Sequence, residues 1–543
     1  MLYESLTKKV FASIRAPWHF FVSVIKTVER RSLSAHAFFA TFFAIIVIRL
    51  VEQWWIGGFK VESFVDTALR SAEMVFAFLF VLMALVFVWR LILQLPLHNV
   101  LPVLLTGMPI ILIAPLFDLV YKGEIISYYE ITNIPGLVLS FFTVFGQTPQ
   151  TGITIGYRLE IILSVIFAVL YARVHTKKFY RIFLVALGTY SVFFAVSALI
   201  SLVGILVIGV TKGFFSVTHI DIATLFMAPQ DVLVHRNTSM RQAFFFYVDM
   251  VYIPIVSALA IFFVYKHLPK IWELLKRSIA YHVIILYIFA CILGFVSAAM
   301  LVGKHISDLI TSNLFAGIMG ITLIIIGFFY GTASSISTSH RELLPVRFVL
   351  YASSIFFSTL IRPISGVLVL SAYALRVVRS YNPLCLANLP IVAQILAAAE
   401  LCVLALFGAS VLSTDSMRIF ANNAIMICIF CTFGMLIVTY NTLMQNKIFA
   451  SSHREKSNAV VRREMVALGL AVAWFFVYLL SISILNTYGI ALPIAILCAS
   501  ITSIVLWYSI SCPKISQKTA FTIVQGISIS YTTGLFVALS YVL

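Results

Sequence analysis

The sequence predicts an all-α protein that crosses a membrane many times. Of its 543 residues, 62% are hydrophobic and only 10% are charged, and the mean hydropathy is +1.06. Because a soluble domain carries about 25% charged residues, this chain has too little polar surface to be soluble. Apolar runs of about 20 residues, the length of a bilayer-spanning helix, recur along the whole chain. Lipid offers no partner for unpaired backbone groups, so such runs are expected to form helices.

We expect about 15 membrane spans, arranged in two membrane domains. A basic, amphipathic cytoplasmic segment over residues 1–36 precedes an N-terminal domain of about six helices over 37–266. A cytoplasmic linker over 267–278 leads to a C-terminal domain over 279–543. The predicted spans are 37–55, 73–95, 98–121, 157–175, 181–210, 244–266, 279–301, 307–330, 346–375, 386–412, 418–440, 466–487, 489–511 and 519–542.

Two stretches of the N-terminal domain depart from a simple spanning helix. The apolar run at 132–147 is bounded by Pro135 and Gly146. It is too short to cross a bilayer, so we expect it to be re-entrant or interfacial. The stretch 96–115 is rich in proline, which removes backbone donors and disrupts helices. Broken helices at mid-membrane would support a transporter, and this stretch is the best sequence hint of one.

The distribution of Lys and Arg sets the orientation, because loops rich in these residues stay in the cytoplasm. The basic clusters are the N-terminus, 173–181, 266–277, 340–347, 376–379, 447–463 and 514–518. They share one side only if 346–375 is a tight hairpin that turns at Arg362 and Pro363. One long helix through 346–375 is the alternative.

The hairpin puts the N-terminus in the cytoplasm and the C-terminus outside, in a plasma or inner membrane. The formal net charge of +17 then reflects this topology and contact with anionic lipid head groups. We therefore expect no nucleic-acid partner.

Charged residues inside the predicted spans are candidates for function, because burying a charge in lipid is costly. Glu400 lies in the middle of a span, between Ala397 and Cys402, and is a candidate for a cavity-facing role. The other charges lie nearer the span ends, where we expect them to reach the interface or to pair with one another: Arg49, Glu52, Arg90, Asp118, Asp249 and Asp308.

Residues 376–543 carry a series of short patterns in a distinctive order. These are Arg379-Ser-Tyr-Asn382, then Tyr440-Asn441 after two spans, then Arg462-Arg463-Glu464-Met465, Asn486 and Trp507-Tyr508-Ser-Ile-Ser-Cys-Pro-Lys514. The series resembles the first five helices of the UbiA superfamily of intramembrane prenyltransferases. The resemblance implies a UbiA-like helical bundle in the C-terminal half, with a cytoplasmic loop that holds a prenyl diphosphate. The first 270 residues carry no comparable pattern.

The loop that the resemblance implies, Tyr440 to Met465, lacks the residues for the family's chemistry. The aspartates that hold Mg²⁺ in the family would fall on Thr442, Gln445 and Phe449. These side chains cannot replace carboxylates as ligands of a hard cation. We therefore expect no cofactor and no Mg²⁺-dependent transfer.

A second arrangement extends the resemblance to residues 276–543. The order Tyr330-Gly-Thr332 and then Ser339-His340-Arg341-Glu342 repeats the order Tyr440-Asn-Thr442 and then Ser452-His453-Arg454-Glu455. The resemblance would then imply a whole nine-helix domain in which both loops lack aspartate. The alternative is a chance recurrence of Ser, His and Arg at the ends of membrane helices.

The sequence thus predicts a degenerate UbiA-like domain that binds a polyprenyl or other lipid phosphate without metal, as a pseudoenzyme or a lipid-handling subunit. Arginine suits this role because its planar fork matches phosphate oxygens. The candidate binding residues are Arg379, Asn382, Glu400, Asn441, Lys447, His453, Arg454, His340 and Arg341.

The expected partners are membrane lipids, isoprenoid phosphates among them, and other subunits of a membrane-protein complex. Three alternatives stay open. The chain is a transporter or flippase-like carrier that uses Glu400, a scaffold of a membrane complex, or an active prenyltransferase with relocated metal ligands.

Overall fold

A computed structural model of the chain consists of helices and their connections in all the residues that it describes. The described residues are 18–30, 35–56, 64–121, 134–144, 154–199, 201–203, 205, 240–301, 314–336, 341–380, 390–411, 423–449, 456–485, 491–510 and 517–542. Within them, 12 helical segments are long and apolar enough to cross a membrane. The all-α, polytopic class predicted from the sequence is therefore confirmed.

Three further described helices, α2, α18 and α24, also have 18 residues or more. They are outside the set of 12. If all three cross as well, the chain has the predicted total of about 15 spans. That total stays a prediction.

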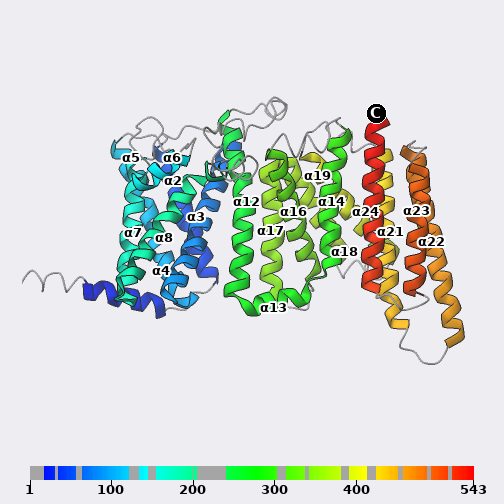
Figure 1. The fold of residues 1–543 in the computed structure, drawn as a ribbon, viewed down its shortest axis with the longest axis horizontal. Coiled ribbons are helices and arrows are strands. Elements are labelled where there is room, and N and C mark those ends of the chain that lie inside the picture. The colour runs from blue at the N-terminus through cyan, green and yellow to red at the C-terminus, as the bar shows by residue number, and fades with distance from the viewer. Residues whose placement is uncertain are drawn as a thin grey trace, which may run out of the picture. The chain divides into compact units, whose positions relative to one another are not determined.

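The chain divides into two compact units, and among the described residues the first ends at Pro269 and the second begins at Lys270. This boundary falls inside the predicted linker 267–278, which the structure forms as helix α13 (Pro269–Ser278). Each unit is described separately below, and Figure 1 shows the helices of both.

The N-terminal unit contains a set of long helices and three shorter ones around the proline-rich stretch. Its elements are α2 (Ala35–Ile56), α3 (Phe64–Leu93), α4 (Leu97–Gly107), η1 (Met108–Leu112), α5 (Ile113–Tyr121), α6 (Ile134–Phe142), α7 (Ile155–His175), α8 (Phe179–Ser197) and α12 (Met240–His267). Helix α3 packs against α8 and α12, and α7 packs against α5 and α8.

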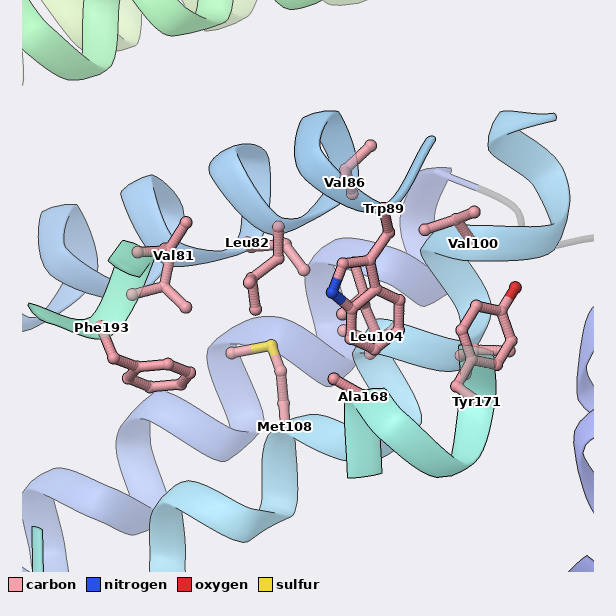
Figure 2. Close-up of a cluster of buried hydrophobic side chains, with 14 of the residues drawn as sticks. Val81, Leu82, Val86, Trp89, Val100, Leu104, Met108, Ala168, Tyr171 and Phe193 are labelled. Atoms are coloured by element: carbon pink, nitrogen blue, oxygen red, sulfur yellow. The ribbon is translucent and has the colours of Figure 1, made fainter. Parts of the chain in front are cut away.

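The core of this unit is an aromatic and aliphatic cluster between α3, η1, α7 and α8. Figure 2 shows Trp89 of α3 and Met108 of η1 pointing into the same cluster. The Trp89 ring stacks on Tyr171 with centroids 5.0 Å apart, and its Nε1 donates a hydrogen bond to Thr189 Oγ1 at 2.9 Å. The buried indole thus gains both packing area and a partner for its polar atom.

The proline-rich stretch forms one helical segment over 97–121 that a 3-10 turn interrupts. The segment runs as α4, a 3-10 turn and α5, and Pro109 lies in the turn. A stretch of 3-10 helix inside a longer helix often marks a functional hinge or local strain. The short run predicted at 132–147 forms α6, which at 9 residues is too short to span a bilayer.

Part of the predicted cytoplasmic segment 1–36 is a helix over residues 18–30. Figure 1 shows it lying across the ends of the long helices of its unit, as an interfacial helix does. It is fixed to α7, because Glu29 accepts hydrogen bonds from Tyr171 Oη at 2.9 Å and pairs with His175 Nε2 at 2.7 Å. Residues 1–17 lie outside the described part of the chain.

The C-terminal unit contains nine long helices in its described residues. After α13 these are α14 (Tyr281–Leu301), α16 (Leu314–Ser335), α17 (Leu344–Ile361), α18 (Pro363–Ser380), α19 (Pro390–Ser410), α21 (Asn423–Phe449), α22 (Lys456–Leu485), α23 (Ala491–Ile510) and α24 (Gln517–Val542), with the short turn η3 (Arg341–Leu343) before α17. Helix α14 contacts α16, α19 and α24, and α19 also contacts α18 and α21.

The predicted hairpin within 346–375 is confirmed. Helix α17 ends at Ile361, Arg362 is extended (φ −156°, ψ 145°), and α18 begins at Pro363. The two helices pack against each other. The rings of Tyr351 and Tyr373, which lie equally far from the turn, have centroids 4.7 Å apart. The chain therefore reverses at Arg362, where proline prevents the helix from continuing.

The predicted ends of the loop from Tyr440 to Met465 are wrong, and residues 450–455 between the two helices lie outside the described part of the chain. Helix α21 continues through Asn441 to Phe449, and α22 already begins at Lys456. Sequence reasoning ended the first helix where its apolar run ended. Polar residues prolong a helix beyond the bilayer because their side chains are hydrated there while the backbone bonds continue.

Candidate functional site

The candidate site is built around Glu400, which lies in the middle of α19 and is fully buried. The helix comes unusually close to α14, because a Cβ at Gly294 would lie 1.7 Å from the carbonyl oxygen of Ala405. A Cβ at Gly408 would lie 1.9 Å from the carbonyl oxygen of Cys291. Glycines allow such a crossing of membrane helices, and it brings α14 within reach of Glu400.

Two tyrosines donate hydrogen bonds to the carboxylate of Glu400. Tyr287 Oη, on α14, lies 2.8 Å from Oε1, and Tyr330 Oη, on α16, lies 3.1 Å from the same oxygen. The two rings pack with centroids 5.2 Å apart, and both residues are buried. One carboxylate oxygen is thus satisfied by neutral donors from two other helices.

Two arginines of α18 form ion pairs with the second carboxylate oxygen. Arg379 Nη1 lies 3.4 Å from Oε2 and Arg376 Nη1 lies 3.9 Å from it. Arg376 also donates to the carbonyl oxygen of Ser334 at 2.6 Å and to Tyr287 Oη at 3.3 Å. The pairing explains how a charge tolerates this depth, because an unpaired buried carboxylate is strongly unfavourable.

The site carries more positive than negative charge. Two guanidinium groups share one carboxylate, and their side chains remain 18% and 22% exposed while Glu400 is wholly buried. The buried carboxylate therefore holds both arginines in place, while part of each arginine side chain remains exposed. Chemically, this arrangement suits the binding of an anion better than acid–base catalysis.

Of the nine residues predicted for the site, the structure brings Arg379 and Glu400 together. Asn441 lies on α21 and is half-buried, next to Tyr440, whose ring contacts His282 and Phe521. Of the others, Lys447 and Arg341 belong to α21 and η3, but their side chains lie outside the described part. His340, Asn382, His453 and Arg454 lie outside it altogether.

Sequence reasoning missed Tyr287, Arg376 and the hydrogen-bonding role of Tyr330. A signal was available for Arg376, because it precedes Arg379 by three residues and such residues share one face of a helix. Tyr330 was noticed only as part of a repeated pattern. Nothing in the sequence connects Tyr287 with Glu400, since they are separated by 113 positions.

Metal chemistry finds no support at this site. Among the described residues, no group of three or more His, Cys, Asp or Glu side chains is placed to hold a metal ion. Glu400 is the carboxylate of the site, and its oxygens already accept from tyrosine hydroxyls and pair with two guanidinium groups, whose positive charges would repel a cation.

The chain was compared with known proteins. No protein-family model, curated protein or solved structure matches it. Its function is therefore argued from the site alone.

Proposed function

We propose that this chain is a multi-pass membrane protein whose C-terminal unit binds the anionic head group of a membrane lipid, with a polyprenyl phosphate as the first candidate. Binding takes place at Arg376 and Arg379 and involves no metal-dependent transfer. The observation that carries the proposal is the sharing of one buried carboxylate by two partly exposed arginines. The pair keeps an excess positive charge for a ligand.

The geometry of the arginines favours phosphate over other anions. A guanidinium presents a planar fork of donors that fits two phosphate oxygens at once. Glu400 and the carbonyl of Ser334 already fix the Arg376 side chain. Less conformational entropy is therefore lost when a ligand binds. Both arginines also belong to a cluster that the positive-inside rule places at the cytoplasmic interface, where lipid head groups lie.

A degenerate UbiA-like domain remains our proposal for the C-terminal unit. It is supported by the short patterns from Arg379 to Lys514, and the nine long helices in the described residues of the unit equal the number that the extended resemblance requires. Thr442, Gln445 and Phe449 stand where that family carries aspartates. We therefore infer that the domain acts as a pseudoenzyme or a lipid-handling subunit.

The test is lipid binding by the purified full-length protein in detergent, measured by native mass spectrometry. The probes are a long-chain polyprenyl phosphate, phosphatidylglycerol and phosphatidylcholine. We expect Arg376→Gln and Arg379→Gln each to weaken binding of the anionic probes about tenfold or more, because hydrogen bonds to charged groups are worth about 1.5–3 kcal/mol. Phosphatidylcholine reports binding that does not depend on net charge.

The matched control is Arg277→Gln, which removes an exposed basic residue of α13. It should bind all three lipids like the wild type. Equal binding by the wild type and the two α18 variants would refute the proposed site. Preference for the polyprenyl phosphate over phosphatidylglycerol identifies the isoprenoid chain as part of the ligand.

A separate measurement distinguishes lipid binding from an active prenyltransferase. The purified protein is incubated with a polyprenyl diphosphate and Mg²⁺, and released diphosphate is quantified. We expect no release and no effect of Mg²⁺ on lipid affinity. Mg²⁺-dependent release would favour the active enzyme with relocated ligands.

A further inference from the structure

The N-terminal unit contains a second buried charge cluster, at the break between α4 and α5. Arg49 of α2 donates a hydrogen bond from Nη1 to the carbonyl oxygen of Ile111, in the 3-10 turn, at 2.7 Å. Its Nη2 lies 3.7 Å from Oε2 of Glu160, on α7. The Arg49 side chain is 7% exposed and that of Glu160 is 0% exposed. An ion pair thus connects two helices to the broken segment.

Glu160 is completely buried, yet neither of its carboxylate oxygens accepts a hydrogen bond from any residue that the structure describes. Its pairing with Arg49 is at ion-pair distance only. The nearby Asp118 contrasts with it. Asp118 accepts from Thr154 Oγ1 at 2.8 Å and from the Gly156 backbone nitrogen at 2.9 Å. Of the two carboxylates, Glu160 is therefore the one whose burial in the ionised form costs more free energy, and protonation removes that cost.

A cavity of about 40 Å³ lies beside the break. Its lining is mainly apolar and includes Ile111, and Ser164 and Thr189 provide its polar side chains. Ser164 lies one helical turn after Glu160 on α7, and Ile111 is the residue whose carbonyl binds Arg49. The cavity therefore borders the 3-10 turn that binds Arg49, although neither Arg49 nor Glu160 lines it.

We propose that Glu160 is a proton-exchange site of the N-terminal unit. As a carboxylate, it pairs with Arg49. When one proton from water adds to a carboxylate oxygen, the ion pair is lost and Arg49 keeps its bond to Ile111 at the break. Buried carboxyl groups beside broken helices are where carriers couple proton movement to transport. The inference is independent of lipid binding in the C-terminal unit.

The other charged and titratable groups around Glu160 are few. Arg49 and Asp118 face it from α2 and α5. Glu52 lies beyond Arg49, and the Tyr157 hydroxyl on α7 accepts a hydrogen bond from Ser197 of α8 at 2.8 Å. A structural ion pair would keep Glu160 ionised at every pH at which the protein is folded, whereas an exchange site alternates between the two forms.

The test is labelling of the full-length protein in lipid nanodiscs by a hydrophobic carbodiimide, which reacts with protonated carboxyl groups. Peptide mass spectrometry locates the adducts. We expect an adduct on Glu160 that decreases as the pH rises and that is lost in Glu160→Gln. In Arg49→Gln, labelling should persist to higher pH, because a buried carboxylate without a counter-charge retains its proton.

Glu29→Gln is the matched control, because Glu29 is hydrogen-bonded at the end of α7 rather than within the cluster. The Glu29→Gln variant should form as much adduct on Glu160 as the wild type does. A second readout is the infrared band of protonated carboxyl groups, compared between the wild type and Glu160→Gln over the same pH range. The absence of both the adduct and the difference band would overturn the proposal. If Na⁺ or K⁺ at constant pH protects Glu160 from labelling, Glu160 binds a metal cation rather than a proton, and the proposal is overturned as well.

Discussion

At the scale of single residues, the helix crossing at Gly294 and Gly408 controls the geometry of the Glu400 site. Tyr287 and Glu400 each lie about two helical turns before the glycine on their own helix. The crossing therefore fixes how far the tyrosine hydroxyl is from the carboxylate. Both glycines would place an added Cβ against backbone of the other helix, where no side chain can move aside.

We predict that Gly294→Ala and Gly408→Ala each reduce stability by about 1–3 kcal/mol, the usual cost of overpacking a well-packed core. Thermal unfolding of the purified protein measures this change. The same variants should also lose bound anionic lipid, because moving α14 away from α19 weakens the hydrogen bond from Tyr287 to Glu400. The control is Gly469→Ala on α22, where an added Cβ meets no atom within 4 Å and stability should change by no more than about 1 kcal/mol. Unchanged unfolding of the two crossing variants would contradict the prediction.

Arg379 and Glu400 could be predicted from the sequence because each is unusual where it stands, a charge at or within an apolar helix. Tyr287 is one of 23 tyrosines, and its role appears only when α14 packs against α19. A polar residue in a membrane helix can thus be singled out by its surroundings along the chain, whereas its partners across the bundle depend on helix packing.

At the scale of the elements, the hairpin of α17 and α18 was predicted from the sequence by excluding one long helix. It followed from the need to place every basic cluster on one side, and the reversal at Arg362 confirms it. The ends of the loop at Tyr440–Met465 were predicted inaccurately, because hydropathy marks where a helix leaves the bilayer rather than where its hydrogen bonds end. Helices α21 and α22 both continue past that point.

The hairpin makes a topological prediction about Arg362. If both α17 and α18 cross the bilayer, the turn lies on the side opposite to the basic clusters. A cysteine in Arg362→Cys should then react with a membrane-impermeant maleimide added to intact cells, above the background of the seven native cysteines. Lys270→Cys, in the basic linker helix α13, should react only after the cells are opened. Arg362→Cys that stays unreactive until the cells are opened would place the turn inside the bilayer or on the cytoplasmic side.

At the scale of the whole molecule, the number of crossings decides where the two ends lie. In the part of the chain that the structure describes, twelve segments are long and apolar enough to cross, and an even number of crossings returns the chain to its starting side. The additional helices α2, α18 and α24 are each at least 18 residues long, and α2 carries Arg49 and Glu52 within an apolar sequence. An odd total of about 15 requires all three to cross.

We predict that the two ends of the chain lie on opposite sides of the membrane, with Met1 in the cytoplasm and Leu543 outside. The physical reason is that α18 must return the hairpin to the basic side, and that Arg49 in α2 is neutralised by Glu160 rather than exposed to lipid. Separate epitope tags on the two ends, probed by protease in intact cells, measure this directly. The C-terminal tag should be cleaved and the N-terminal tag protected. Cleavage or protection of both tags together would mean that either one or all three of α2, α18 and α24 do not cross, and the Arg362→Cys result then tells whether α18 is among them.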